Sequence, residues 1–303
     1  MRFLKFVLVL FCLVLFLALS QQANAKMKKA KSIDELAARY DVSSCMECHE
    51  EIYEQWEKSL HSRSLFGTGR TAATIVTTIT KGLMTWPYSG VKKPKDVKVK
   101  HFMMCAKCHL PQLAEAKDSV IKEIIEIAFM KIRTKADFHK RREILSKLNI
   151  NCLICHRKNA IVHKWLDGYP EKEKGVLYGT RDVEEHEDEV YTRVKKNPIM
   201  SESILCGQCH GLGPNFEFDN PSQCASAYGS YLFNYISRGG SETCQSCHMR
   251  KFDKGHLMPA YRDIDMAKAA VEIDVDAASY PAHKLAMVDV KMTNKAGHNF
   301  PDG

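Results

Sequence analysis

The stretch Cys45-Met46-Glu47-Cys48-His49 is the first of five related motifs in this sequence. Each has two cysteines separated by two residues and followed directly by a histidine, and the others begin at Cys105, Cys152, Cys206 and Cys244. Cysteines at positions i and i+3 lie on one face of a helical turn, where both sulfurs can form thioethers with the vinyl groups of one porphyrin. The next residue then offers an imidazole nitrogen to the iron. The pattern predicts five sites of covalent c-type haem attachment.

The five motifs supply the candidate cofactor-binding residues. The cysteines predicted to bind the porphyrins are Cys45, Cys48, Cys105, Cys108, Cys152, Cys155, Cys206, Cys209, Cys244 and Cys247. The histidines predicted to bind iron from the proximal side are His49, His109, His156, His210 and His248. The expected cofactors are therefore five c-type haems with their iron.

Zinc ribbons, structural disulfides and thioredoxin-like redox pairs also use closely spaced cysteines. A zinc site of this kind needs a second pair, and five is an odd number of pairs. Neither zinc nor disulfide chemistry accounts for a histidine after every second cysteine, so we favour haem attachment. Cys224 is left over in the mature chain. We interpret it as a buried inert thiol, with an intermolecular disulfide or a ligand near a haem as the open alternatives.

The first 25 residues have the organisation of a secretory signal peptide. Arg2 and Lys5 flank an apolar run over 6–19 that is too short to span a bilayer, and Ala23-Asn24-Ala25 forms a cleavage site. The alternative is a retained anchor, which would need about 20 apolar residues. We expect the mature protein to start at Lys26 and to be periplasmic or extracellular. Haem attachment of this type takes place outside the bacterial cytoplasm, in agreement with export.

The overall charge says little about partners. Without the two basic residues of the leader, 42 basic residues remain against 36 acidic ones, a formal charge of +6. Ten ionised propionates from five haems would reverse it to −4, so the composition does not indicate a nucleic-acid partner. The chain is 45% hydrophobic and has only 16 glycines and 10 prolines, which excludes collagenous and broadly disordered classes.

The predicted fold is mainly α with extensive irregular loops, built around stacked haems. About 56 residues of mature chain serve each porphyrin, too few to build an independent core around it. The haems must therefore pack against one another. We divide the chain into a signal peptide (1–25), a pentahaem cytochrome domain (26–280) and the start of a C-terminal β-containing segment (281–303), where the sequence reads as truncated.

Local patterns predict several elements. Helices are expected after Ser32, over 47–61, through the apolar stripe 121–132, and from a Thr134 cap to about 148. Residues 68–100 are expected to form an extended loop, and the acidic run 182–189 a solvated helix or loop. Residues 288–292 alternate like a short strand, with no pairing partner in view.

Eight histidines lie outside the motifs, enough to give every iron a second, distal ligand. The expected distal ligands are His61, His101, His163, His256 and His298. His61 lies 12 residues beyond His49, about 18 Å along a helix, so it should serve a different haem. Surface or core roles remain the alternatives for each histidine, above all for His186 in its acidic run. Met249 and Met258 are alternative ligands, or ordinary packing residues.

The chain resembles bacterial multihaem c-type cytochromes, in particular the superfamily of the tetrahaem cytochrome c of ammonia oxidisers. The resemblance rests on CMECH followed by Trp56-x-x-Ser59-x-His61, on CQSCHM at 244–249 and on the closing GHNFPDG. It implies that His61 and His298 are distal ligands. Relatives usually continue past the closing element into further strands, which supports the interpretation of a truncated chain.

The same family includes enzymes that convert nitrite, hydroxylamine, sulfite and tetrathionate. Pentahaem nitrite reductases resemble this chain in haem number, but their catalytic haem has a proximal lysine. The sequence contains no Cys-x-x-Cys-Lys motif.

We therefore expect an electron-transfer protein, as in anaerobic respiration, rather than an enzyme, and no catalytic residue is assigned. The expected partners are a quinol-oxidising membrane cytochrome or other donor and a terminal reductase, other cytochromes or an extracellular acceptor, with peripheral membrane association. Two alternatives stay open. One is an oxidoreductase that binds a small nitrogen or sulfur oxyanion at an open haem, and the other is a subunit of a cytochrome filament in which a distal histidine comes from the next chain.

Overall fold

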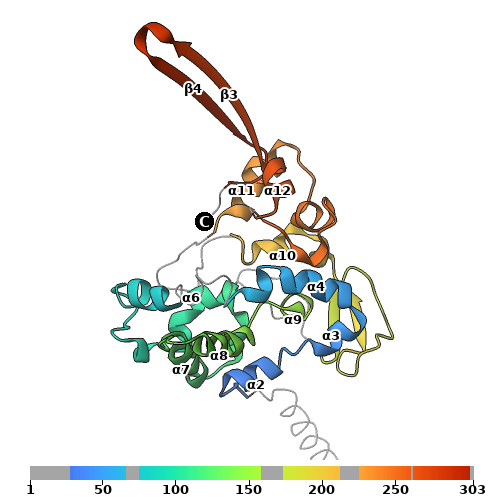
Figure 1. Ribbon diagram of the computed structural model, residues 1–303. Coiled ribbons are helices and arrows are strands. Elements are labelled where there is room, and N and C mark those ends of the chain that lie inside the picture. The colour runs from blue at the N-terminus through green and yellow to red at the C-terminus, as the bar shows by residue number, and fades with distance from the viewer. Residues whose placement is uncertain (1–27, 66–74, 158–172, 212–224, 261, 301–303) are drawn as a thin grey trace, which may run out of the picture.

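The computed structural model describes residues 28–65, 75–157, 173–211, 225–260 and 262–300. Short helices and loops form the body of the molecule, and one long hairpin projects from it (Figure 1). The α-helices are α2 (Ile33–Ala38), α3 (Ser43–Cys48), α4 (Glu50–Lys58), α6 (Val99–His109), α7 (Asp118–Ala128), α8 (Lys135–Ser146), α9 (Cys152–His156), α10 (Ser203–Gly207), α11 (Ala227–Asn234) and α12 (Ile264–Ala270). This confirms the expected mainly-α fold with extensive loops.

Every motif lies on or at the end of a short helical segment. The first three lie on α3, α6 and α9, the fourth begins at the end of α10 and continues into the following turn, and the fifth begins just before the π-helical turn η7 (Ser246–Arg250). A single turn places the two cysteines of each motif on one side, as thioether bonds to one porphyrin require. The expected helix over 47–61 is divided into α3 and α4, because His49 between them has φ −120° and ψ 42°.

Two helix starts confirm their predicted caps. The Ser32 hydroxyl accepts a hydrogen bond from Glu35 N–H at 3.1 Å at the start of α2. The Thr134 hydroxyl accepts one from Asp137 N–H at 3.1 Å, and the Asp137 carboxylate accepts one from Thr134 N–H at 2.9 Å. This reciprocal pair is a capping box, and it starts α8 as the sequence predicts.

The main aliphatic core lies in the first half of the chain. Helix α7 contributes its whole apolar stripe, and Val120, Ile121, Ile124, Ile125 and Ala128 are all buried. The stripe ends with α7, and Ile132 beyond it is exposed, contrary to expectation. A much smaller cluster around Val176, Tyr178 and Met200 lies in the second half. The described residues of the second half therefore have little aliphatic core of their own.

Replacing Ile124 by alanine is expected to destabilise the protein by about 2–5 kcal/mol, because the side chain is fully buried in this core. Ile132→Ala makes the same chemical change at a side chain that is 38% exposed, and should cost less than about 1 kcal/mol. Urea unfolding followed by far-ultraviolet circular dichroism measures both. Equal losses for the two variants would contradict the assignment of the core to α7.

The predicted extended loop over 68–100 is wrong in its later part. A π-helical turn η2 (Thr78–Leu83), a 3-10 turn η3 (Pro94–Asp96) and the start of α6 lie within it, whereas residues 66–74 lie outside the described residues. Helical turns form here because they bring apolar side chains to one side, and Ile75, Ile79 and Leu83 are buried.

The projecting hairpin pairs β3 (Val271–Tyr280) with β4 (Leu285–Asn294) in antiparallel register, from Val271 opposite Asn294 to Tyr280 opposite Leu285. The expectation that the strand at 288–292 has no partner is therefore wrong, because its partner lies immediately upstream. The predicted boundary at 280/281 falls at the turn of this hairpin. A second, unexpected sheet pairs β1 (Val176–Gly179) in parallel with β2 (Arg193–Lys196).

None of the helices in the described ranges is both long enough and apolar enough to cross a membrane.

Candidate functional site

Four of the five motif histidines face a histidine from elsewhere in the chain. The ring centroids are 6.3 Å apart for His49 and His186, 6.1 Å for His61 and His210, 6.3 Å for His156 and His256, and 6.1 Å for His248 and His298. Each pair combines one motif histidine with one histidine outside the motifs. The two rings are near parallel in three pairs, at 14°, 30° and 18°, and nearly perpendicular, at 86°, between His61 and His210.

These separations fit one metal ion between two imidazoles. A metal–imidazole bond of about 2 Å on each side, plus about 1 Å from each nitrogen to its ring centre, gives a centroid separation of about 6 Å. Two imidazoles with a porphyrin between them form the six-coordinate arrangement suited to electron transfer. The residues present therefore fit haem iron at the first, third, fourth and fifth motifs.

Backbone carbonyls anchor four of these rings through Nδ1. His156 donates its Nδ1–H to the Tyr178 carbonyl at 2.8 Å, His186 to that of Tyr191 at 2.6 Å, His248 to that of Pro259 at 2.8 Å and His298 to that of Asn299 at 2.8 Å. A carbonyl can only accept, so Nδ1 carries the proton and Nε2 is the nitrogen available to a metal. These contacts set both the tautomer and the orientation of each ring.

Burial keeps two of the facing imidazoles neutral. It lowers the pKa of His61 to about 4, with a further contribution from His210, and lowers the pKa of His256 to about 4, with further contributions from His156 and His49. An imidazole with a lowered pKa is protonated only below that value, so both rings are neutral at pH 7. Neutral imidazole is the form that binds a metal.

His61 is held in place by the segment that precedes it. Trp56 is buried and donates its indole N–H to the carbonyl of Ile150 at 2.8 Å, and Ile150 N–H donates back to the carbonyl of His61 at 3.1 Å. The Ser59 hydroxyl accepts a hydrogen bond from His61 N–H at 3.2 Å. The Trp-x-x-Ser-x-His spacing thus fastens His61 to the segment before the third motif while its ring faces the fourth.

Three expected distal ligands lie opposite motif histidines, and two do not. His61, His256 and His298 face His210, His156 and His248. His101 lies near the start of α6, where its Nδ1 accepts a hydrogen bond from Lys98 N–H at 3.1 Å, and it faces no motif histidine in the described chain. It is two helical turns, about 12 Å, from His109 of the same helix, so the two cannot bind one iron. His163 lies outside the described residues.

His186, which faces His49, is not among the distal ligands expected from the sequence. Its loop folds back on itself, with His186 N–H donating to the Thr192 carbonyl at 2.8 Å. Asp188 accepts hydrogen bonds from the N–H groups of Val190 and Tyr191, both at 2.7 Å, and its carboxylate lies close to the Ser44 hydroxyl of α3. The acidic run suggested a solvated surface, but an aspartate two residues after a histidine is also a turn-forming signal.

The motif cysteines show which attachment sites adjoin. Three pairs of cysteines from different motifs lie close enough to shift each other's pKa values: Cys45 with Cys152, Cys108 with Cys209, and Cys206 with Cys244. Cys155 also lies close enough to Cys206 and Cys209 to raise their pKa values electrostatically, after the larger effects of the paired cysteine and of burial. The first motif therefore adjoins the third, the third adjoins the fourth, and the fourth adjoins both the second and the fifth.

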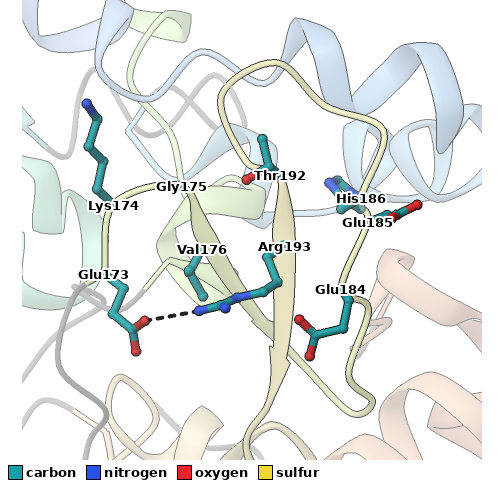
Figure 2. Close-up of a pocket in the computed structure, with 9 residues that line it drawn as sticks. All are labelled: Glu173, Lys174, Gly175, Val176, Glu184, Glu185, His186, Thr192 and Arg193. Atoms are coloured by element: carbon teal, nitrogen blue, oxygen red, sulfur yellow. Dashed lines mark hydrogen bonds and ion pairs between the residues drawn. The ribbon is translucent and has the colours of Figure 1, made fainter.

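A surface cavity of about 530 Å³ lies beside the His186 loop (Figure 2). Charged side chains line it, including Glu173, Glu184 and Glu185, and Glu173 forms an ion pair with Arg193 at 3.4 Å. The cavity opens to solvent next to the first facing pair. That pair is therefore close to the protein surface, in a strongly polar environment.

Residues 44–127 match the family model described as cytochrome c554 and c-prime. The matched stretch contains the first two motifs and His61. The match supports a c-type cytochrome family, and with it covalently bound c-type haem and a role in electron transfer. No match was found among curated proteins or among solved structures.

Proposed function

We propose that this chain is an exported multihaem cytochrome that carries single electrons through five covalently bound haems. The observation that carries the proposal is the set of four facing histidine pairs, because a second imidazole leaves no iron position for a substrate. When bound, each haem supplies a one-electron couple. The protein's own residues attach it and orient its ligands, and burial keeps His61 and His256 neutral at pH 7.

The contacts between motifs suggest the order of the haems. In this order the haem of the first motif is next to that of the third, and the third is next to the fourth. The fourth is next to both the second and the fifth. The first-motif pair lies beside the solvent-open cavity, so we assign one point of electron exchange to that end. The partners are redox proteins: a quinol-oxidising membrane cytochrome or another donor on one side, and a terminal reductase, another cytochrome or an extracellular acceptor on the other.

The mass of the mature protein together with its electron paramagnetic resonance spectrum as isolated tests this proposal. We expect a mass with five haems attached, and low-spin signals from the haems of the first, third, fourth and fifth motifs. The perpendicular pair at the fourth motif should give a more anisotropic low-spin signal than the three near-parallel pairs. A protein without attached haems, or with mainly high-spin signals, would overturn the proposal.

A second candidate function is reduction or oxidation of a small nitrogen or sulfur oxyanion at the second motif. Among the described residues no other histidine ring faces His109, unlike the other four motif histidines. A high-spin signal that shifts on addition of nitrite or sulfite, and that is lost in a Cys105→Ala/Cys108→Ala variant, would support catalysis there. A second motif with a low-spin signal insensitive to both anions would eliminate it.

The filament alternative receives no support from the facing pairs. It would be favoured if His61 or His298 had no iron within its own chain. Both histidines face a motif histidine of the same chain.

A further inference from the structure

Gln55 on α4 contacts the turn that carries His256, although the two residues are 201 positions apart. The side-chain oxygen Oε1 of Gln55 accepts a hydrogen bond from the backbone N–H of His256 at 2.9 Å. The turn is the 3-10 segment η8 (Gly255–Leu257), which packs against α4. A side chain beside the first motif therefore holds the main chain of a residue that faces the third.

The turn is shaped for this contact. Gly255 has φ +50°, in the left-handed region, and a β-carbon at this position would overlap the Gln55 amide. Met258, which follows the turn, is also left-handed at φ +45°. Only glycine allows the main chain to approach Gln55 this closely. The contact with Gln55 therefore depends on glycine at position 255.

His256 depends on its main chain more than the anchored histidines do. The rings of His156, His186, His248 and His298 are each held by a carbonyl that accepts from Nδ1. No hydrogen bond from the His256 ring to another described residue is present. The position of its imidazole, 6.3 Å from that of His156, therefore follows from the backbone that Gln55 holds.

We propose that Gln55 is a positioning residue for the third-motif haem, keeping the His256 imidazole opposite His156. The inference rests on the proposed function, in which these two histidines hold one iron. Loss of the contact should let the η8 turn move and the distal ligand dissociate more often. The haem would then bind external ligands faster and have a shifted reduction potential.

Three variants of the intact, haem-loaded protein test the proposal. Gln55→Ala removes the acceptor, Gln55→Glu keeps an acceptor at the same place, and Glu54→Ala alters the neighbouring exposed residue, whose contact is an ion pair with Lys58 on the surface. The readouts are the rate of cyanide binding by stopped-flow absorbance, the reduction potentials and the low-spin resonance signals. In Gln55→Ala, cyanide binding at one haem should become at least tenfold faster, whereas Gln55→Glu and Glu54→Ala should stay within about twofold of the parent.

A Gln55→Ala protein with unchanged cyanide kinetics, potentials and spectrum overturns the proposal. If Gln55→Ala does not fold, Gly255→Ala tests the same contact from the other side and should produce the same faster binding at one haem. The proposed function has a separate test. It requires the His256→Ala variant to have one low-spin haem fewer than the parent protein. If His256→Ala loses that haem signal while Gln55→Ala has unchanged cyanide kinetics, reduction potentials and spectrum, only the positioning role of Gln55 is wrong.

Discussion

Replacing Cys206 and Cys209 together by alanine is expected to remove one haem and to destabilise the protein more than the same change at Cys244 and Cys247. The fourth motif adjoins three others: Cys206 lies beside Cys244, Cys209 lies beside Cys108, and both lie near Cys155. The fifth motif has a thiol contact with the fourth alone among the described residues. A haem at the fourth motif therefore packs against more of the cofactor core than one at the fifth.

The size of the difference follows from the shortage of aliphatic core in the second half of the chain. Among the residues that the structure describes there, Val176, Tyr178 and Met200 form its separate buried apolar cluster. Without the fourth haem this half has little else to bury, so we expect a loss of about 4 kcal/mol or more, the range reserved for major damage to a core. Loss of the fifth haem should cost clearly less and leave the other four sites assembled.

Mass spectrometry establishes that each double variant contains four haems, and denaturant unfolding followed by far-ultraviolet circular dichroism gives the two stability losses. The two variants are matched, because both remove one complete attachment site by the same two substitutions. Equal losses, or a greater loss at the fifth motif, would contradict the branched order of the haems.

Periodicity and motif spacing predicted the parts of the fold that local interactions decide. The stripe of α7 and the caps at Ser32 and Thr134 depend on residues within one or two helical turns, and all three are present. The break at His49 could not be predicted in the same way, because residues 47–61 are compatible with one continuous helix. The motif ends at that residue, and the chain changes direction there.

Contacts between segments far apart in the sequence leave weaker signals in the sequence itself. His186 reaches His49 because Asp188 closes its loop and lies close to Ser44, which places together segments more than 100 residues apart. In the sequence alone, the surrounding carboxylates indicate only a solvated segment. His101 is the opposite case. It is close to the second motif in sequence, but this places it on the same helix as His109, where it cannot reach the opposite side of the same iron.

The strand at 288–292 illustrates a missed local signal. The upstream segment Val271-Glu272-Ile273-Asp274-Val275-Asp276 alternates between apolar and acidic residues as clearly as the strand that was predicted. Their pairing places Ile273 opposite Met292 and Val275 opposite Val290 on one face, and these side chains are 52–66% exposed. The hairpin was therefore predictable from the sequence, whereas its projection from the body was not.

Replacing His61 by alanine is expected to convert one haem from low-spin to high-spin, whereas His101→Ala should leave every haem unchanged. His61 faces His210 at 6.1 Å and is neutral at pH 7, because burial lowers its pKa to about 4. Its main chain stays anchored through Ile150 and Ser59 in the variant, so the substitution removes a ligand without releasing the segment. His101 caps the start of α6 and faces no motif histidine in the described chain.

The perpendicular ring planes of this pair make the outcome specific. The most anisotropic low-spin signal should disappear from the resonance spectrum of His61→Ala, a high-spin signal should replace it, and the reduced protein should bind one equivalent of carbon monoxide at the vacated position. Added imidazole should restore a low-spin signal by occupying the space left by the side chain. If the most anisotropic signal survives in His61→Ala, or disappears in His101→Ala, then His61 is not the distal ligand of the fourth-motif haem, and the facing of the two rings has another cause.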